Sequence, residues 1–332
     1  MRTLIVIVNW RTGGLTVDCL RSLAPQVAEV DARVVVADNA SGDGSIEQVA
    51  DEIARNGWSW AETLPLPRNG GFAYGNNAVL RRFAIPDSRS SDAQRQVAHH
   101  ASQFPYVLLL NPDTVVRPGA LRELVAFMDA HPGVGIAGSR LEDPDGTPQV
   151  SAFRFHGVAS EFERGMRLGV VSRLLASRRV PQPVCDTAHP TDWLAGASMI
   201  VRRDVFERIG LLDEGYFMYY EEVDFCLRAR RAGFEVWYVP SSRVVHLVGS
   251  ASQLSDARRH RKRRPGYWFD SRRRYFLKNL GVLRAAAADA AFLIGFAVWR
   301  VRRWIQRKPD PDPPMFLWDS IRNSVFLRGN RL

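Results

Sequence analysis

The amino-acid sequence predicts an α/β fold, with a doubly wound and mostly parallel sheet flanked by helices. Three observations predict it: short apolar runs recur along the chain, amphipathic helical patterns separate them, and polar or glycine-rich turns close each run. Strands that alternate with helices in this way pair in parallel, because each connection returns to the same end of the sheet. With 332 residues, 46% of them hydrophobic, the chain is long enough to bury a large core.

The first half of the chain alternates strands and helices in order. We expect strands at 3–8, 33–38 and 60–66, and helices at 15–26, from Ser45 onward and at 72–83. The most apolar strand, Val107–Leu110, is followed by Asn111, Pro112 and Asp113. A continuous apolar run that stops at a turn sequence is typical of a strand buried on both faces. Asp113 would then stand at the carboxyl end of a central strand, where open α/β sheets bind ligands.

The second half is less regular. We expect a helix from Pro118, a strand from Trp193 through Val201, a short helix near Val205, a helix from Glu222 to Ala232, a strand from Glu235 to Val239, and helices after that. Residues 85–102 are polar and predict a surface insertion. Residues 154–190 predict a variable connection with one helix and a mobile loop. The apolar stretch 285–299 is shorter than the ~20 residues of a membrane-spanning helix, so we expect no span there.

The net charge of +10 is unevenly distributed. Residues 257–332 carry a net charge of +14, and residues 1–256 carry −4. Such a basic tail indicates an anionic partner, either a membrane surface or nucleic acid. Nucleic acid is the less favoured partner, because few aromatic residues interleave the arginines for base stacking. The three cysteines have unrelated spacings, which predicts neither a disulfide framework nor a zinc site and fits a reducing cytoplasm.

Two polar clusters follow early strands. Asp38–Asp43 offers a carboxylate that can accept hydrogen bonds from a base or a ribose, and the alternative is that Asp and Ser only cap the next helix. Asn69–Asn77 contains three glycines around a helix start, where bare backbone lets a diphosphate approach N–H groups. This second segment matches neither the dinucleotide nor the Walker pattern, so a simple Asn-Gly turn is its alternative.

Two further clusters lie near the end of the predicted sheet. Glu221, Glu222 and Asp224 open a helix next to tyrosines. Mutual repulsion and burial raise the pKa of neighbouring carboxyls, as a general base requires, although acids at a helix start are also favoured by the helix dipole alone. His246 begins a serine-containing segment that ends at Ser252. This histidine could share a metal ion with Asp113, or it could be an ordinary packed side chain.

Together and in this order, these segments resemble the family-2 glycosyltransferases of the GT-A fold, especially bacterial rhamnosyltransferase-like members. The resemblance covers roughly residues 1–279. The matching segments are Val8-Asn9-Trp10, Ala37-Asp38-Asn39-Ala40-Ser41, Asn69-Gly70-Gly71-Phe72-Ala73-Tyr74-Gly75-Asn76, Leu109-Leu110-Asn111-Pro112-Asp113, Trp193-Leu194-Ala195-Gly196-Ala197, the block from Asp213 to Arg228, and His246 to Ser250.

The resemblance implies inverting transfer of a sugar from a nucleoside diphosphate to an acceptor hydroxyl. Glu222 would be the base, with Glu221 or Asp224 as substitutes, and Asp113 with His246 would hold Mg²⁺ or Mn²⁺. The residues implied for the donor and acceptor pocket are Asn9, Asp38, Asn39, Asn69, Gly70, Gly71, Phe72, Gly75, Asn76, Asn111, Trp193 and Gly196. Two positions depart from the family pattern: Asn111 replaces the first aspartate of the metal motif, and Glu222 replaces an aspartate.

The resemblance also implies a division of the chain and a set of partners. Residues 1–255 would form the GT-A domain, with a nucleotide-sugar half at 1–115 and an acceptor half at 116–255, followed by a basic helical extension at 256–332. The favoured donor is dTDP-L-rhamnose, and the acceptor is a glycan or a lipid-linked sugar for cell-wall or surface polysaccharide. We expect a cytoplasmic protein, peripheral on the inner face of the membrane.

Two questions stay open at this point. The apolar helix in the extension would lie in an anionic membrane interface, or else pack inside the protein or at a homodimer contact. The alternatives to an enzyme are a nucleotide-sugar-binding regulator without transferase activity and a basic nucleic-acid-binding protein.

Overall fold

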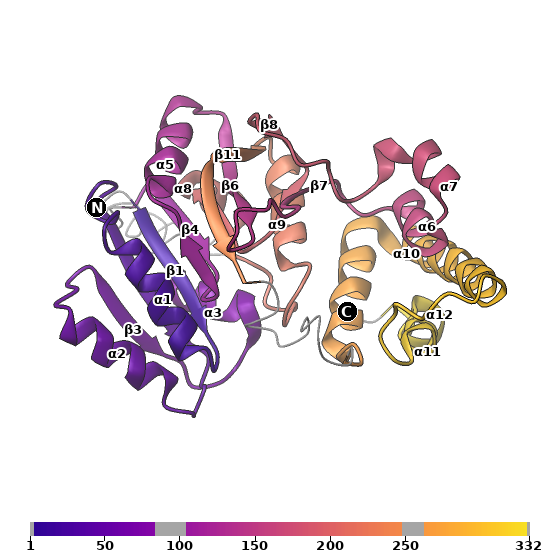
Figure 1. The fold of residues 1–332 in the computed structure, drawn as a ribbon, viewed down its shortest axis with the longest axis horizontal. Helices are drawn as coiled ribbons and strands as arrows, with labels where there is room; N and C mark the ends of the chain where they lie inside the picture. The colour runs from indigo at the N-terminus through magenta and orange to yellow at the C-terminus, as the bar shows by residue number, and fades with distance from the viewer. Residues whose placement is uncertain (1–2, 84–103, 248–261, 331–332) are drawn as a thin grey trace.

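The computed structural model describes residues 3–83, 104–247 and 262–330, and shows a central sheet with helices on both of its faces (Figure 1). The first half follows the predicted alternation closely. Its elements are β1 (Thr3–Asn9), α1 (Gly13–Leu23), β2 (Ala32–Asp38), α2 (Ser45–Arg55), β3 (Ala61–Pro65), α3 (Gly71–Arg82) and β4 (Tyr106–Leu110). The predicted insertion at 85–102 lies outside the described residues.

Alternating side chains of these strands build two separate cores. Ile5 and Ile7 of β1 point to the face covered by α1, while Leu4 and Val6 point to the opposite face. This period of two is what a strand requires when both of its faces are buried. The α/β prediction with a sheet between helical layers is therefore confirmed.

The second half adds strands of both directions. Its elements are β5 (Thr114–Val116), α5 (Ala120–Ala130), β6 (Val134–Glu142), β7 (Ala152–Phe153), β8 (His189–Pro190), β9 (Trp193–Leu194), β10 (Ser198–Arg202), α8 (Arg203–Ile209), α9 (Glu221–Arg231) and β11 (Glu235–His246). The main sheet has the order β3-β2-β1-β4-β10-β6-β11-β5. β1 to β4 pair in parallel, and β10 joins antiparallel between β4 and β6.

Four details differ from the sequence prediction. The strand expected from Trp193 through Val201 is two strands separated by a turn at 195–197. β11 continues seven residues beyond Val239, past a register shift between Val239 and Arg243, so His246 is the last residue of a strand. β6 was not predicted. Residues 154–190 contain two α-helices, α6 (Val158–Met166) and α7 (Gly169–Leu174), and one 3₁₀ turn (Ala176–Arg178), where only one helix was expected.

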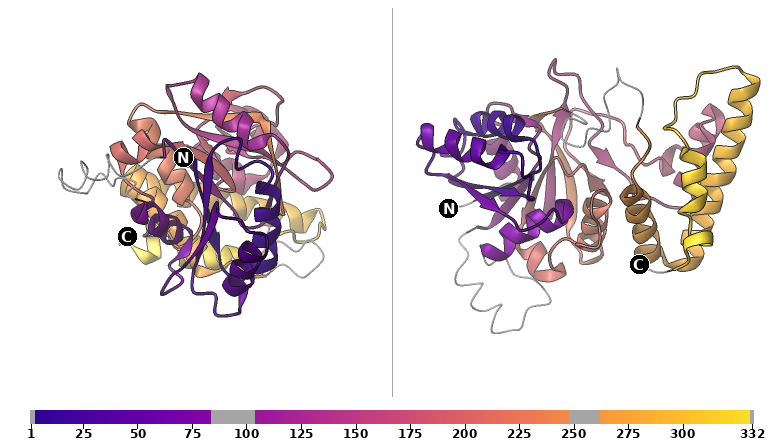
Figure 2. Two further views of the ribbon diagram at one scale, coloured as in Figure 1. Left: turned by 90° about the vertical axis from the view of Figure 1, so that its left-hand side faces the viewer. Right: turned by 90° about the horizontal axis from the view of Figure 1, so that it is seen from below.

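The C-terminal helices pack with α6 beside the sheet (Figures 1 and 2). They are α10 (Gly266–Ile305), α11 (Phe316–Arg322) and α12 (Val325–Arg328). Gly281, with φ of 80°, interrupts α10 and divides it into two halves. Tyr275 and Phe276 of the first half belong to the same core cluster as Leu4 and Val6, so this half is part of the sheet-side core.

The second half of α10 crosses α6 at two glycines. A Cβ added to Gly165 would lie 2.5 Å from Phe292 O, and one added to Gly295 would lie 2.8 Å from Phe162 O. Only glycine allows the two backbones to approach this closely. By length and composition α10 is also the one helix among the described residues that could cross a membrane. The sequence prediction rested only on the apolar run 285–299, whereas the helix extends well beyond that run at both ends.

Candidate functional site

A hydrogen-bonded node fixes the carboxyl ends of β1 and β2. Asn9 Nδ2 donates to Asp38 Oδ1 (2.6 Å) and to Ser45 Oγ (3.0 Å), and Asn9 Oδ1 accepts from the Thr12 hydroxyl (2.8 Å). Asp38 Oδ2 accepts from the backbone N–H of Ser41 (3.0 Å). Asn9 and Asp38 are both buried, at 0% and 3% exposed. The side chains therefore hold the strand ends together, and contact of Asp38 with a nucleoside stays a prediction.

The glycines at the start of α3 allow other parts of the protein to approach the backbone closely. Gly71 has φ of +87°, and a Cβ there would lie 1.9 Å from Phe217 O, which accepts the N–H of Phe72 at 3.0 Å. A Cβ on Gly75 would lie 2.7 Å from Val8, and one on Gly70 would meet the Tyr74 ring. The close approach that these glycines permit is thus made by this chain itself. It fixes the start of α3 against the loop that precedes α9.

Neighbouring asparagines reinforce the same junction. Asn69 Oδ1 accepts the N–H of Gly71 (3.0 Å), and Asn39 Nδ2 donates to Gly71 O (3.0 Å). Asn76 Nδ2 donates to Phe72 O (2.9 Å), while its buried Oδ1 has no hydrogen-bond partner among the described residues. Asn77 was not predicted as a site residue. Its amide exchanges two hydrogen bonds with the backbone of Leu212 (2.9 and 3.1 Å), which anchors the loop before α9 to α3.

The turn between β9 and β10 lies against the acidic start of α9. A Cβ added to Gly196 would lie 3.7 Å from Glu222 Cβ and 3.9 Å from the Phe72 ring, so these three residues meet. The N–H of Asn111 donates to Ala197 O (2.9 Å), which brings the end of β4 to the same turn. Three segments far apart in sequence therefore converge on Gly196 and Ala197.

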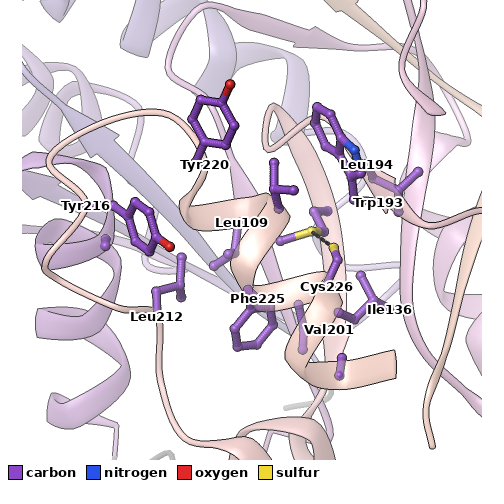
Figure 3. Packing of buried hydrophobic residues seen from close by; sticks show 14 of the residues in the cluster. Leu109, Ile136, Trp193, Leu194, Val201, Leu212, Tyr216, Tyr220, Phe225 and Cys226 are labelled. Atoms are coloured by element: carbon purple, nitrogen blue, oxygen red, sulfur yellow. Dashed lines mark hydrogen bonds between the residues drawn. The ribbon is translucent and has the colours of Figure 1, made fainter. Parts of the chain in front are cut away.

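Trp193 supports this turn from the side. Its indole N–H donates to Arg154 O (2.8 Å), and its ring stacks on Phe153 with 4.1 Å between centroids. Trp193 is 9% exposed, so it packs mainly as part of the core. Figure 3 shows Trp193 and Leu194 lying across from α9, with Tyr216 and Tyr220 on the loop that leads into that helix.

Asp113 and His246 meet at the end of the sheet. β11 pairs with β5 so that His246 lies opposite Thr114, and His246 Nε2 is 3.5 Å from Asp113 Oδ1. A carboxylate and an imidazole at this separation can bind one divalent cation, with phosphate oxygens as further ligands. Among the described residues there is no group of three or more His, Cys, Asp or Glu side chains that could hold a metal. Ser250 and Ser252, expected next to His246, lie outside the described residues.

Two tyrosines in an unusual backbone conformation precede the acidic cluster. Tyr219 and Tyr220 have φ of 71° and 69°, a left-handed region that is costly for residues with a Cβ. α10 helps to hold this loop: the Ser271 hydroxyl donates to Met218 O (2.9 Å), and the Tyr220 ring packs near Tyr275. The C-terminal helices thereby support the segment that carries Glu221 and Glu222.

The three acids of this cluster have different environments. Burial raises the pKa of Glu222 to about 7, and burial together with the charge of Glu222 raises the pKa of Glu221. The Oε2 atom of each is buried and has no hydrogen-bond partner among the described residues. Asp224 bonds to Arg228 (2.9 Å) and Lys278 (2.9 Å), and although burial opposes it, these cations lower its pKa. Asp224 therefore anchors α10 to α9, and the glutamates are the acids suited to accept a proton.

His156 is a neighbour of the site that the sequence did not reveal. It lies between Trp193 and Tyr220, with ring centroids at 5.9 and 5.1 Å, and its side chain is 12% exposed. Burial lowers its pKa, which favours the neutral imidazole. Its segment was interpreted as a variable connection, and a lone histidine without periodic neighbours offered no signal.

The fold agrees with comparisons to known proteins. The model of the family described as "Glycosyltransferase like family 2" matches residues 2–266. The chain is 29% identical over 250 residues to the N-acetylglucosaminyl-diphospho-decaprenol L-rhamnosyltransferase of Mycobacterium tuberculosis, covering 73% of this chain and 75% of that protein. It is also 29% identical over 176 residues to the rhamnosyltransferase WbbL of Escherichia coli K12, covering 53% and 60%.

Solved structures share the fold at low identity. The mannosyltransferase PcManGT of Pyrobaculum calidifontis, in complex with GDP-Man and Mn²⁺, superposes over 100% of this chain and 88% of its own, with a TM-score of 0.55 and 13% identity. GalNAc-T7 with UDP, GalNAc and Mn²⁺ gives a TM-score of 0.53 and 15% identity over 74% of this chain, which spans 44% of that protein.

Proposed function

Because the chain belongs to the glycosyltransferase-like family 2, we propose that it transfers L-rhamnose from dTDP-L-rhamnose to a hydroxyl of a lipid-linked sugar, with inversion at the anomeric carbon. The product would serve cell-wall or surface polysaccharide synthesis on the cytoplasmic face of the membrane. The observation that carries the transfer chemistry is Glu222, a carboxyl of raised pKa at the convergence of Gly196, Phe72 and the end of β4. The names of the rhamnosyltransferase relatives support the sugar, and the diphospho-decaprenol name supports the acceptor class.

In the proposed reaction Glu222 accepts the proton of the acceptor hydroxyl. The hydroxyl oxygen forms a bond to the anomeric carbon on the face opposite the diphosphate, and the bond from that carbon to the diphosphate oxygen breaks. The electron pair leaves with the nucleoside diphosphate, and the proton remains on Glu222 until solvent removes it. A base with a pKa of about 7 is ionised enough near neutral pH to act, and basic enough to take the proton.

Asp113 and His246 are the residues that would hold a divalent cation. The carboxylate oxygen suits both Mg²⁺ and Mn²⁺, and the imidazole nitrogen favours Mn²⁺. When bound, such an ion neutralises negative charge on the diphosphate. Mn²⁺ is named with both structural relatives described above, which supports a metal without identifying it here.

The donor test uses the purified full chain with GlcNAc-diphospho-prenol as acceptor. We expect dTDP release with dTDP-L-rhamnose and Mn²⁺, and little release with UDP-GlcNAc or GDP-mannose. Nuclear magnetic resonance of the product should show an α-L-rhamnoside. Donor binding without any sugar transfer would instead assign the chain to nucleotide-sugar-binding regulators.

The metal test compares matched histidine and aspartate variants. Asp113→Ala and His246→Ala should weaken donor binding by about tenfold or more, since each variant removes a ligand of the cation that neutralises charge on the diphosphate. The exposed residues Asp145 and His131 provide the controls Asp145→Ala and His131→Ala, which should leave donor affinity unchanged. Full transfer in excess EDTA would refute the metal role.

A further inference from the structure

The second half of α10 presents an exposed apolar face. After Gly281, exposed apolar side chains recur every three to seven residues, at Leu283, Ala287, Ile294, Val298, Val301 and Ile305. At 100° per residue these positions fall on one side of the helix. We name these six residues the outer stripe.

The opposite side of the same helix is filled by protein. Its buried residues are Ala285, Ala288, Phe292, Gly295 and Phe296, and they face α6 through the glycine crossing described above. The two sets of positions are half a helical turn apart. The outer stripe therefore points away from the packed side and has no share in the core contacts of α10.

The outer stripe is long. Residues 282–305 extend roughly 36 Å at ~1.5 Å per residue, and Leu283 near one end is 87% exposed. α11 packs on the opposite side of α10, where Phe316 contacts Phe292 and Phe296, so it leaves the outer stripe uncovered. A row of exposed apolar side chains of this length marks an interaction site.

The charges around the outer stripe select its partner. The acids of this region are ion-paired with arginines: Asp289 with Arg272, Asp310 with Arg300, Asp312 with Arg167, and Asp319 with Arg263. Exposed cations remain on the second half of α10 and directly after it, at Arg284, Arg307 and Lys308. A second copy of this surface would bring like charges together, whereas anionic lipid headgroups would be attracted.

We propose that the outer stripe lies in the interface of an anionic lipid bilayer, with the second half of α10 parallel to the membrane plane. The apolar side chains would enter the boundary of the acyl chains, and the surrounding cations would contact lipid phosphates. A spanning orientation is disfavoured, because it would carry α6 and the buried ions Glu161, Arg272 and Asp289 into the hydrocarbon. Docking would bring the site to a lipid-linked acceptor, but the docking itself is independent of the proposed chemistry.

The test is co-sedimentation of the full chain with vesicles, without nucleotide sugar or acceptor. We expect binding to phosphatidylcholine vesicles that contain phosphatidylglycerol, and weak binding to pure phosphatidylcholine. The variant Leu283→Glu/Ile294→Glu should lose roughly tenfold or more of the partition coefficient. The control Val150→Glu/Val184→Glu makes the same charge change at exposed apolar residues (42% and 41% exposed) and should bind within about twofold of wild type.

A second variant keeps the test independent of folding defects. Arg307→Gln/Lys308→Gln removes two exposed cations and should weaken binding to anionic vesicles, as should raising the salt concentration. Unchanged sedimentation of both variants would overturn the proposal, and so would equal binding of wild type to neutral and anionic vesicles. A dimer that the outer-stripe substitutions convert to monomer, with vesicle binding retained, would assign the surface to a second copy.

Discussion

Glu161 and Glu222 of this protein have opposite electrostatic environments. Glu161 lies on the side of α6 that faces α10, and burial there would raise its pKa. The charges of Arg164 and Arg272 outweigh burial and hold the pKa of Glu161 well below its usual value. Glu222 lies at the start of α9, where burial raises the pKa to about 7 and no cation offsets it among the contacts of the described residues. The side chains are chemically identical, so their surroundings alone determine the difference.

The comparison separates structural acids from reactive ones. A buried carboxylate surrounded by cations is stable as an anion and fixes the helices that supply them. A buried carboxyl without such a partner gains and loses a proton near neutral pH, which suits proton transfer. Asp224 belongs with Glu161, although it is only two residues from Glu222.

We expect the largest effect from replacing the reactive acid, Glu222. Glu222→Gln should lower kcat for transfer by about 10²–10⁴-fold, the usual contribution of a general base, while donor binding is retained. Steady-state kinetics and donor titration measure the two quantities. The exposed Glu47 on α2 provides the control Glu47→Gln, which should leave kcat unchanged. A Glu222→Gln variant with wild-type kcat would remove Glu222 from the mechanism.

We expect the next largest effect from replacing Arg272, a cation that pairs with the structural acid Glu161. Arg272→Met leaves Glu161 and Asp289 buried with less compensation and should lower the free energy of unfolding by about 3–5 kcal/mol. Denaturant titration measures it. Arg273→Met is the matched control, because the partner Asp270 is 59% exposed and such a pair contributes at most about 1 kcal/mol. Equal losses in the two variants would contradict a special role for the buried ions.

The contribution of Glu222 to the stability of the wild type should depend on pH in the opposite sense to that of a salt-bridged acid. The folded-state pKa of Glu222 lies above the usual 4.5, so wild type loses stability as pH rises through about 7 and the carboxyl ionises. The glutamine variant lacks this loss and should gain about 1 kcal/mol or more over wild type between pH 5 and pH 8. Thermal unfolding at several pH values tests this. A stability difference that is constant with pH would show that Glu222 has an ordinary pKa.

The smallest effect concerns the neighbouring acid. Burial and the charge of Glu222 raise the pKa of Glu221, and this repulsion acts in both directions. Glu221→Gln should therefore ease ionisation of Glu222 and move the acidic limb of kcat/KM to lower pH by less than about one unit. A pH–rate profile of the variant beside wild type measures the shift. Movement toward higher pH would mean that the two carboxyls do not repel each other.

The sequence predicted the alternating first half of the fold but not β6. Val134–Glu142 contains two glycines and no apolar run, so the chain pattern gave no strand signal. The glycines are explained by distant partners: a Cβ on Gly135 would lie 2.7 Å from Phe234, and one on Gly138 would lie 2.9 Å from Leu194. Such requirements are set by tertiary contacts, which single-chain periodicity cannot report.

The site shows the same limit. The carboxylates and the histidine were identified by residue type, and the structure brings Asp113 beside His246 and Glu222 beside Gly196. The sequence could not show that Asn9 and Asp38 are used in internal hydrogen bonds, or that Gly71 serves the approach of Phe217. Partners that lie 29 or more residues away leave no local pattern.

Gly281 lies between the part of α10 that supports the candidate site and the part that carries the outer stripe. Before it, Arg274 and Lys278 fasten α10 to Asp213, and after it the helix carries an outward apolar side. The angle between the two halves of α10 is made at this residue, and the packing of α10 on α6 and the Arg272–Asp289 ion pair hold it. Because φ of 80° is unfavourable for a residue with a side chain, a larger residue at position 281 would change the angle between the two halves of α10 without altering either of them.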